Sequence, residues 1–310
     1  MISDLFNVTV LIGIVSSGIR LATPYLYASI GETFGQRSGI LNLGVEGQML
    51  LGAFAAFFVA LNTGNLWLGV LTAMAVGALM GLAMGFVTVH LHAQQGISGI
   101  GFYLFGLGMS NLLFQLMIGT VETVRGFPGL EIPFLSSIPV IGNIFFSQNI
   151  LVYIAFLLVP AAWFILNKTN LGLKIHAVGE NPEAADSLGV SVSGIRYFTT
   201  ILGGTLSGLG GASLSIALLN VFQQNMTAGL GFIAVALVYF GGWRPWGILA
   251  GALLFSMVNA LQLWIQVLGI PIPSQFAVMM PYILTILVLT ASVSKMRAPS
   301  ALTKPFEREG

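Results

Sequence analysis

Apolar stretches of about 20 residues follow one another through most of this chain, and they constrain its fold more than any other feature. A helix needs about 20 mainly apolar residues to cross the hydrocarbon core of a membrane. Such stretches occur at roughly 11–31, 41–61, 66–90, 97–118, 150–167, 195–219, 228–242, 246–268 and 276–293. The sequence therefore predicts an all-α polytopic membrane protein with about nine transmembrane helices in a single domain, 1–310.

The charged residues agree with a membrane protein and exclude several functions. Only 7% of the residues are charged, against roughly 25% in a soluble domain. Lys plus Arg (11) and Asp plus Glu (10) nearly cancel, so we expect no basic surface for nucleic acid. The chain has no cysteine, which excludes disulfides, thiolate metal sites and cysteine nucleophiles. No basic residues precede the first apolar stretch, so no cleavable signal peptide is expected.

The basic residues predict the orientation, because they collect on the cytoplasmic side of membrane proteins. One side of the predicted topology holds Arg37, Lys168, Lys174, Arg196, Arg244, Lys295, Arg297, Lys304 and Arg308. Arg125 lies on the other side. We therefore expect the segment 168–196 and the tail 294–310 to be cytoplasmic. The loop 119–149 and the amino terminus should be extracytoplasmic, and the loop is either an ordinary ordered loop or contains a short re-entrant or surface helix.

The longest polar interruption after the midpoint is 168–196, and it contains signals for a short helix. Asn181 can cap the first turn, and Pro182 fits the first helical position. Glu183 lies where the helix dipole favours negative charge, and Gly189 supplies a left-handed stop. We expect an apolar strip of Ala184, Ala185 and Leu188 and an acidic side of Glu180, Glu183 and Asp186. Because so short a helix is marginal alone, we expect a partner protein to pack on it.

A second polar stretch lies at the start of the second predicted span. Asn42 and Glu46 are four residues apart, so we expect them to share a helix face, and Glu32 could pair with Arg37. A carboxylate inside a span indicates a functional site by default. Three alternatives stay open for Glu46: a structural hydrogen bond, contact with a solute, or a place near water before the helix begins.

Other polar and aromatic residues inside the spans are candidates for a solute path. Amides need partners in hydrocarbon and could instead read a polar, uncharged ligand, while aromatic rings could stack on a flat one. Plain helix packing is the alternative for the aromatic residues. The candidate path residues are Asn42, Glu46, Phe102, Tyr103, Phe105, Asn111, Gln115, Asn220 and Phe232.

Several catalytic motifs are missing or incomplete. The chain has no phosphate-binding G-x-x-x-x-G-K-[ST] motif and no H-E-x-x-H, so neither ATP hydrolysis by that route nor zinc catalysis is predicted. The serine motif 96–99 lacks a histidine in any later span, which argues against an intramembrane protease. Charges in the spans are too few for a proton relay.

Faint similarity of 43–53 to 206–214, and of 99–108 to 231–242, is compatible with an internal repeat.

Two motifs, RSGILNLGVEG at 37–47 and AVGENPEAA at 177–185, resemble the permease subunits of bacterial ABC importers for nucleosides, simple sugars and branched-chain amino acids. The first motif is most similar to the nucleoside branch, and the resemblance covers nearly the whole chain. It implies a transporter subunit of the cytoplasmic (inner) membrane that is not itself an enzyme. The segment matching Gly179–Gly189 would be the coupling helix, seated in a groove of an ATPase.

The resemblance also implies the partners. A second permease chain, two cytoplasmic ATPase subunits and an extracytoplasmic solute-binding lipoprotein would complete the transporter, with ATP and Mg²⁺ bound by the ATPases and no cofactor on this chain. The expected solute is a nucleoside, then another ringed metabolite such as a flavin, then a monosaccharide. An ion-coupled secondary transporter is the alternative, and it would need clustered carboxylates where this sequence offers Glu46.

Overall fold

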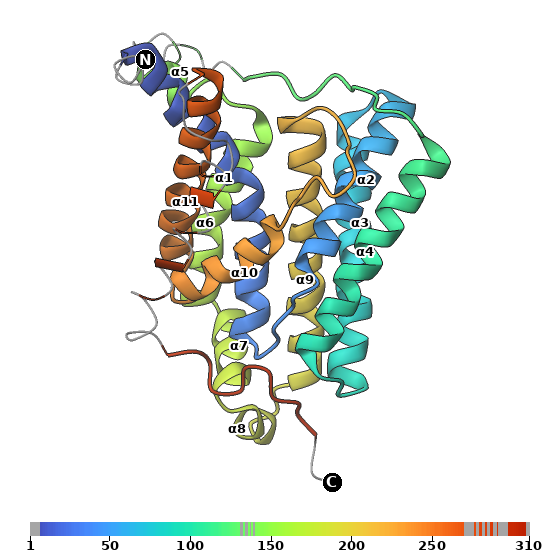
Figure 1. Ribbon diagram of the computed structural model, residues 1–310. Helices are drawn as coiled ribbons and strands as arrows, with labels where there is room; N and C mark the ends of the chain where they lie inside the picture. Colours follow the sequence, from blue (N-terminus) through green and yellow to red (C-terminus); the bar gives the residue numbers. More distant parts are fainter. Residues whose placement is uncertain are drawn as a thin grey trace.

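The computed structural model describes residues 7–130, 133, 136, 138, 140–269, 276, 279, 280, 283, 286, 287, 290 and 297–307. These residues form a bundle of helices, and no strand occurs among them (Figure 1). Seven helices are long and apolar enough to cross a membrane. They are α1 (Val8–Arg37), α2 (Val45–Thr63), α3 (Leu66–Gly85), α4 (Gln95–Met117), α6 (Ile150–Lys168), α9 (Val192–Ser213) and α11 (Pro245–Val267), with π-helical turns extending α3 to His90 and α9 to Leu218. The predicted all-α polytopic fold is confirmed.

The predicted span 228–242 is a shorter helix, α10 (Leu230–Phe240). Its 11 residues cover roughly 16 Å, about half of the hydrocarbon core. The backbone is left-handed at Gly229 before α10 (φ 93°) and at Gly242 and Trp243 after it (φ 60° and 56°). The irregular segment 219–229 descends from the end of α9 and makes the crossing together with α10 (Figure 1). Most of the predicted span 276–293 lies outside the described residues.

Three short helices lie outside the spans. α5 (Ile141–Phe145) belongs to the loop 119–149, and α8 (Pro182–Ser187) is the short helix that the sequence predicts in 168–196. α7 (Asn170–Glu180) was not predicted. Thr169 caps it, and Ile175 and Val178 are buried, so a capping residue followed by apolar residues at helical spacing was the signal.

The helix α9 lies in the middle of the bundle and packs against α1, α2 and α3 (Figure 1). Its glycines allow the backbones to approach closely, as is common between membrane helices. A Cβ at Gly204 would lie 2.2 Å from the carbonyl oxygen of Gly77 in α3, and a Cβ at Gly211 would lie 2.0 Å from that of Met49 in α2. The glycine-rich sequence of α9 thus serves packing in the bundle core.

The helix α1 connects the two ends of the bundle. α1 is 30 residues long, about 45 Å, and it runs through the bundle to the end that holds α7, α8 and the tail residues 297–307 (Figure 1). At that second end the tail residue Thr303 bonds to Gly39, and Ala301 bonds to Gly179. The beginning of α1 therefore lies at the end of the bundle opposite the segment 168–196.

Candidate functional site

The carboxylate of Glu46 holds the amino-terminal end of the broken helix α10. Its side chain is 1% exposed. Oε1 accepts hydrogen bonds from the Thr227 hydroxyl (2.6 Å) and the Gly229 N–H (2.7 Å), and Oε2 accepts one from the Gly231 N–H (2.6 Å). These donors include free amides of the first turn of α10, where the helix dipole favours negative charge. The Glu46 carboxylate is thus buried and bonded within its own chain, so the alternative of a place near water is wrong.

Asn42 and Glu46 do not share a helix face, because α2 begins only at Val45 and Asn42 belongs to the turn before it. The Asn42 N–H donates to Glu32 (3.0 Å), and its side-chain amide donates to Gln48 (3.2 Å). Asn42 is 3% exposed. Its contacts are therefore with its own chain, and it fixes the turn between α1 and α2.

The expected pair between Glu32 and Arg37 is also not formed. Glu32 accepts bonds from Gln36 and Asn42 inside the bundle. The guanidinium of Arg37 donates instead to the Trp243 carbonyl oxygen, at 3.0 and 3.1 Å. Glu32 and Arg37 are five residues apart on α1, which places their side chains on different sides of the helix.

Three exposed amide side chains lie between α9 and α10, in a segment that runs beside α4. Phe222 packs against Phe114 of α4 at 5.4 Å, and ten residues later Phe232 packs against Tyr103 at 5.1 Å. The chain between these contacts therefore runs along α4, over about 16 Å of its length. This stretch exposes Gln223, Gln224 and Asn225. Their backbone neighbours Phe222 and Thr227 are fully buried, so the segment is anchored and presents its amides outward.

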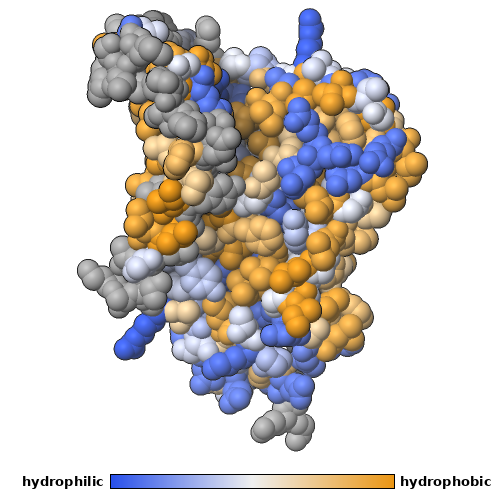
Figure 2. Space-filling model, in the orientation of Figure 1, coloured by the Kyte–Doolittle hydropathy of each residue, from blue (hydrophilic) through white to orange (hydrophobic). Residues whose placement is uncertain are grey.

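We call this surface the open face and define it by Tyr103, Asn111, Gln115, Gln223, Gln224, Asn225 and Phe232. Hydrophilic atoms cross the otherwise hydrophobic surface over the segment between α9 and α10 (Figure 2). None of the seven residues is charged. Gln115 and Phe232 are exposed, Tyr103 is partly exposed, and the buried amide oxygen of Asn111 has no hydrogen-bond partner. Exposed amides are costly against lipid, so this face needs water or another protein.

The remaining predicted path residues fall around the open face. Phe102 packs on the start of α2, where a Cβ at Gly44 would lie 2.9 Å from the Cβ of Phe102. Phe105 is 52% exposed on the outer side of α4. Asn220 anchors the outer loop, because its carbonyl oxygen accepts from the Val124 N–H at 3.0 Å. Glu46 contacts the segment from the inside of the bundle, and Asn42 fixes the turn between α1 and α2. Of the predicted residues, Tyr103, Asn111, Gln115 and Phe232 therefore gather on the open face.

Sequence reasoning missed Gln223, Gln224 and Asn225. They fall between the predicted spans 195–219 and 228–242, a position that indicates a loop at one end of the bundle. The signal that could have found them is the short apolar run after them, which is too brief for a full crossing and implies a broken span.

The second candidate site is α8 at the opposite end of the bundle. Asn181 Oδ1 accepts from the Ala184 N–H at 3.0 Å, Pro182 occupies the first position, and Gly189 is left-handed with φ 80°. Glu183 is exposed. The predicted cap, start and stop are confirmed.

The predicted apolar strip of α8 is only partly correct. Ala185 is buried with Val178 and Val192. Ala184 is exposed, and Leu188 is 84% exposed. The predicted acidic side is only partly correct, because Glu180 accepts a bond from Ser300 and Asp186 lines a cavity. Ala185 therefore packs α8 on its own chain, while Leu188 and Glu183 are exposed. Such a surface suits a protein partner.

The comparisons with known proteins agree on one family. Residues 14–289 match the family described as branched-chain amino acid transport system / permease component. The guanosine ABC transporter permease protein NupQ of Bacillus subtilis is 36% identical, over 94% of this chain and 96% of its own. The nucleoside ABC transporter permease protein NupC of Lactococcus lactis is 38% identical, over 93% and 94%. TsgC13 of Haloferax volcanii, provisionally named a glucose ABC transporter permease protein, is 38% identical over 96% and 98%. No solved structure matches the chain.

Proposed function

The chain belongs to the family of permease components of branched-chain amino acid transport systems and is an ABC transporter permease, and from this we propose that it lines the route by which a nucleoside-like solute is imported. The route follows the open face, and a second permease chain packs against this face. The observation that carries this proposal is the run of exposed amides at 223–225 beside α4. Lipid cannot satisfy them, whereas a solute path between two permease chains can.

The chemistry of the open face suits an uncharged ringed solute. Tyr103 and Phe232 form an edge-to-face pair (73° between ring planes) that leaves Phe232 38% exposed, so its ring is accessible to a flat solute. The amides of Asn111, Gln223 and Gln224 can donate and accept hydrogen bonds. A charged group would find no counter-ion among the seven open-face residues. A nucleoside meets these demands, and a flavin or a monosaccharide comes next.

The broken helix α10 also bears on the charge of the solute. Half-helix amino termini in transporters commonly face anionic groups of the substrate. Here the carboxylate of Glu46 already occupies the amino-terminal end of α10. The dipole of α10 therefore has its negative partner within the chain, which again favours a neutral solute.

The opposite end of the bundle supplies the coupling to ATP. We assign the seat of a cytoplasmic ATPase subunit to α8, with Glu183 and Leu188 as its exposed contacts. Two such ATPases, a second permease chain forming a heterodimer and an extracytoplasmic binding lipoprotein complete the importer in the cytoplasmic (inner) membrane. Closure of the ATPases shifts the permease pair between inward-open and outward-open states, because α8 is bound differently in each.

Uptake by the complete transporter in vesicles tests the path. We expect guanosine to be taken up in preference to riboflavin and glucose. Gln224→Ala and Phe232→Ala should reduce uptake severalfold while the complex still assembles. Asn62→Ala is the matched control, since Asn62 is an exposed amide in the last turn of α2. Unchanged uptake by both open-face variants would contradict the proposed path.

A further inference from the structure

The carboxyl-terminal segment 299–307, which we call the strap, crosses the cytoplasmic end of the bundle. It bonds to the residues that directly precede α8: the Ala301 N–H donates to the Gly179 carbonyl oxygen (2.9 Å), and the Ser300 hydroxyl donates to Glu180 Oε2 (2.9 Å). The Thr303 N–H donates to the carbonyl oxygen of Gly39, just beyond α1 (3.1 Å). The strap thus joins the base of α8 to the end of α1.

Arg196, in the second turn of α9, fixes the middle of the strap. Its Nη1 donates to the Lys304 carbonyl oxygen (3.1 Å), and its Nε donates to the Ser38 carbonyl oxygen (3.3 Å). The side chain is 2% exposed, and among the described residues no ion pair involves it. A buried cation near the amino-terminal end of a helix is unfavourable by itself. Here its contacts are carbonyl oxygens of two other segments, so it links α9 to α1 and to the strap.

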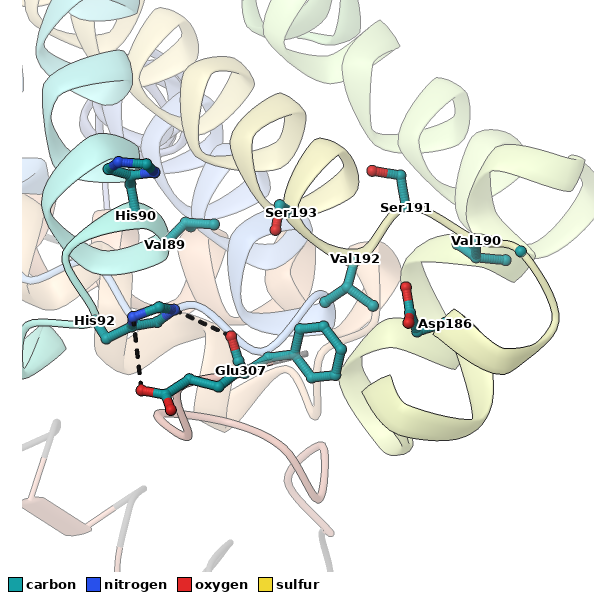
Figure 3. Close-up of a pocket in the computed structure, with 11 residues that line it drawn as sticks. Val89, His90, His92, Asp186, Val190, Ser191, Val192, Ser193 and Glu307 are labelled. Carbon is teal, nitrogen blue, oxygen red and sulfur yellow. Dashed lines mark hydrogen bonds and ion pairs between the residues drawn. The ribbon is translucent and has the colours of Figure 1, made fainter. Parts of the chain in front are cut away.

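The far end of the strap reaches the connection between α3 and α4. Phe306 packs against the cluster of Val178, Ala185 and Val192, which also seats α8. The Phe306 carbonyl oxygen lies 3.1 Å from His92 Nε2, and Glu307 Oε1 lies 3.7 Å from His92 Nδ1. These contacts close one side of a cavity of about 610 Å³, whose other side is the α8–α9 connection (Figure 3).

We propose that the strap and Arg196 are the positioning elements that transmit movement of α8 to α1, α9 and the α3–α4 connection. This inference rests on the proposed seat of the ATPase at α8. α8 has six residues, and Ala185 is its one fully buried side chain. A helix with a single buried side chain would move independently of the other helices. The strap makes α8 part of a rigid unit with helices that pack along the whole bundle, so a push on α8 becomes a tilt of those helices.

The number of solute molecules imported per ATP hydrolysed tests the strap. In the complete transporter, Arg196→Gln and a chain truncated after residue 298 should keep ATPase subunits bound and hydrolysing ATP while uptake per ATP falls severalfold. Arg244→Gln is the matched control, because Arg244 is an exposed arginine at the same end of the bundle. Unchanged uptake per ATP in both strap variants would overturn the inference.

Two further variants separate a loss of coupling from a loss of folding. Ser300→Ala removes one hydrogen bond at an exposed site and leaves the buried contacts in place. It should lower uptake per ATP with an unchanged melting temperature, and a variant that imports normally would count against the strap. Glu183→Lys addresses the ATPase seat alone: if ATPase subunits stay bound to it at normal strength, the proposed seat fails before the strap is in question.

Discussion

Glu46 and Arg196 are buried ionisable residues in different helices of the bundle, and each interacts with backbone groups. Glu46 accepts bonds from two N–H groups at the beginning of α10. Arg196 donates to two carbonyl oxygens, one just after α1 and one in the strap. Among the described residues, no ion pair involves either of them. The anion satisfies free donors and the cation satisfies free acceptors, so each compensates an interruption of helical structure.

Glu46 and Arg196 also support different sites. The interruption at Glu46 supports the open face, where the solute is proposed to pass, and the one at Arg196 supports α8, where the ATPase is proposed to bind. In hydrocarbon an unsatisfied backbone group costs several kcal/mol. Loss of Glu46 should therefore act on folding, whereas loss of Arg196, nearer the water, should act on coupling.

The largest effect is expected from Glu46→Ala. It leaves three donors without an acceptor, and each buried unsatisfied group costs about 1–3 kcal/mol. We expect a destabilisation of about 3 kcal/mol or more and little assembled transporter, measured as melting temperature and as yield of the complex. Thr227→Val, which removes one of the three donors, should cost about 1 kcal/mol. A stable Glu46→Ala variant that assembles but fails to import would instead indicate contact with the solute.

Gly231→Ala disrupts the same contact between Glu46 and the start of α10, and it leaves the charge of Glu46 in place. A Cβ at Gly231 would lie 2.5 Å from the backbone of Glu46, so α10 must move away from the carboxylate. We expect a loss of about 1–3 kcal/mol in stability, read as a lower melting temperature. Gly101→Ala in α4 is the control, because a Cβ there meets open space. Equal melting temperatures for the two variants would show that the close approach is not needed.

His176 lies in α7, at the same end of the bundle as Arg196. Burial lowers its pKa from the ordinary 6.5, and the positive charge of Arg37 lowers it further, while Glu180 opposes this. The folded chain therefore holds the neutral form, and the unfolded chain binds more protons at acid pH. Stability from this group is present above about pH 6.5 and is lost as the pH falls below that value.

The measurement is the melting temperature at about pH 8 and about pH 5.5. The fall between the two values should be smaller in His176→Gln than in the natural chain. Exposed Lys174→Gln serves as the control on the same helix. An identical fall in His176→Gln would show that another group carries the acid sensitivity.

Glu183→Lys should leave the stability of the chain unchanged, because the side chain is exposed. It reverses an exposed negative charge on α8, so we expect weaker binding of the ATPase and loss of uptake, measured by co-purification and transport. Glu122→Lys, on the exposed outer loop, is the matched control. Normal binding and uptake by Glu183→Lys would count strongly against the role of α8.

The sequence predicts the local features of this protein well. The cap, first position and stop of α8 depend on Asn181, Pro182 and Gly189, all within nine residues, and all are confirmed. The long spans follow from the length of the apolar stretches alone. Local residue preferences and the thickness of the membrane are sufficient for these features.

The sequence does not predict contacts between distant segments. The partners of Glu46 lie more than 180 residues further along the chain, so its role as a cap of α10 could not be read from neighbours. The broken span hid the amides at 223–225 within a supposed loop. Arg196 offered a basic residue for the topology, but its carbonyl partners in the strap depend on how the tail folds back.

The most direct test uses the absence of natural cysteines. With Gln224→Cys in the complete transporter, the rate of labelling by a membrane-impermeant maleimide is measured before and after addition of ATP and Mg²⁺. We predict that ATP changes the rate at position 224 and that guanosine slows it, while Asn62→Cys in the last turn of α2 is labelled at one rate throughout. A rate at 224 that responds to neither ATP nor solute would contradict a path along the open face that is driven from α8.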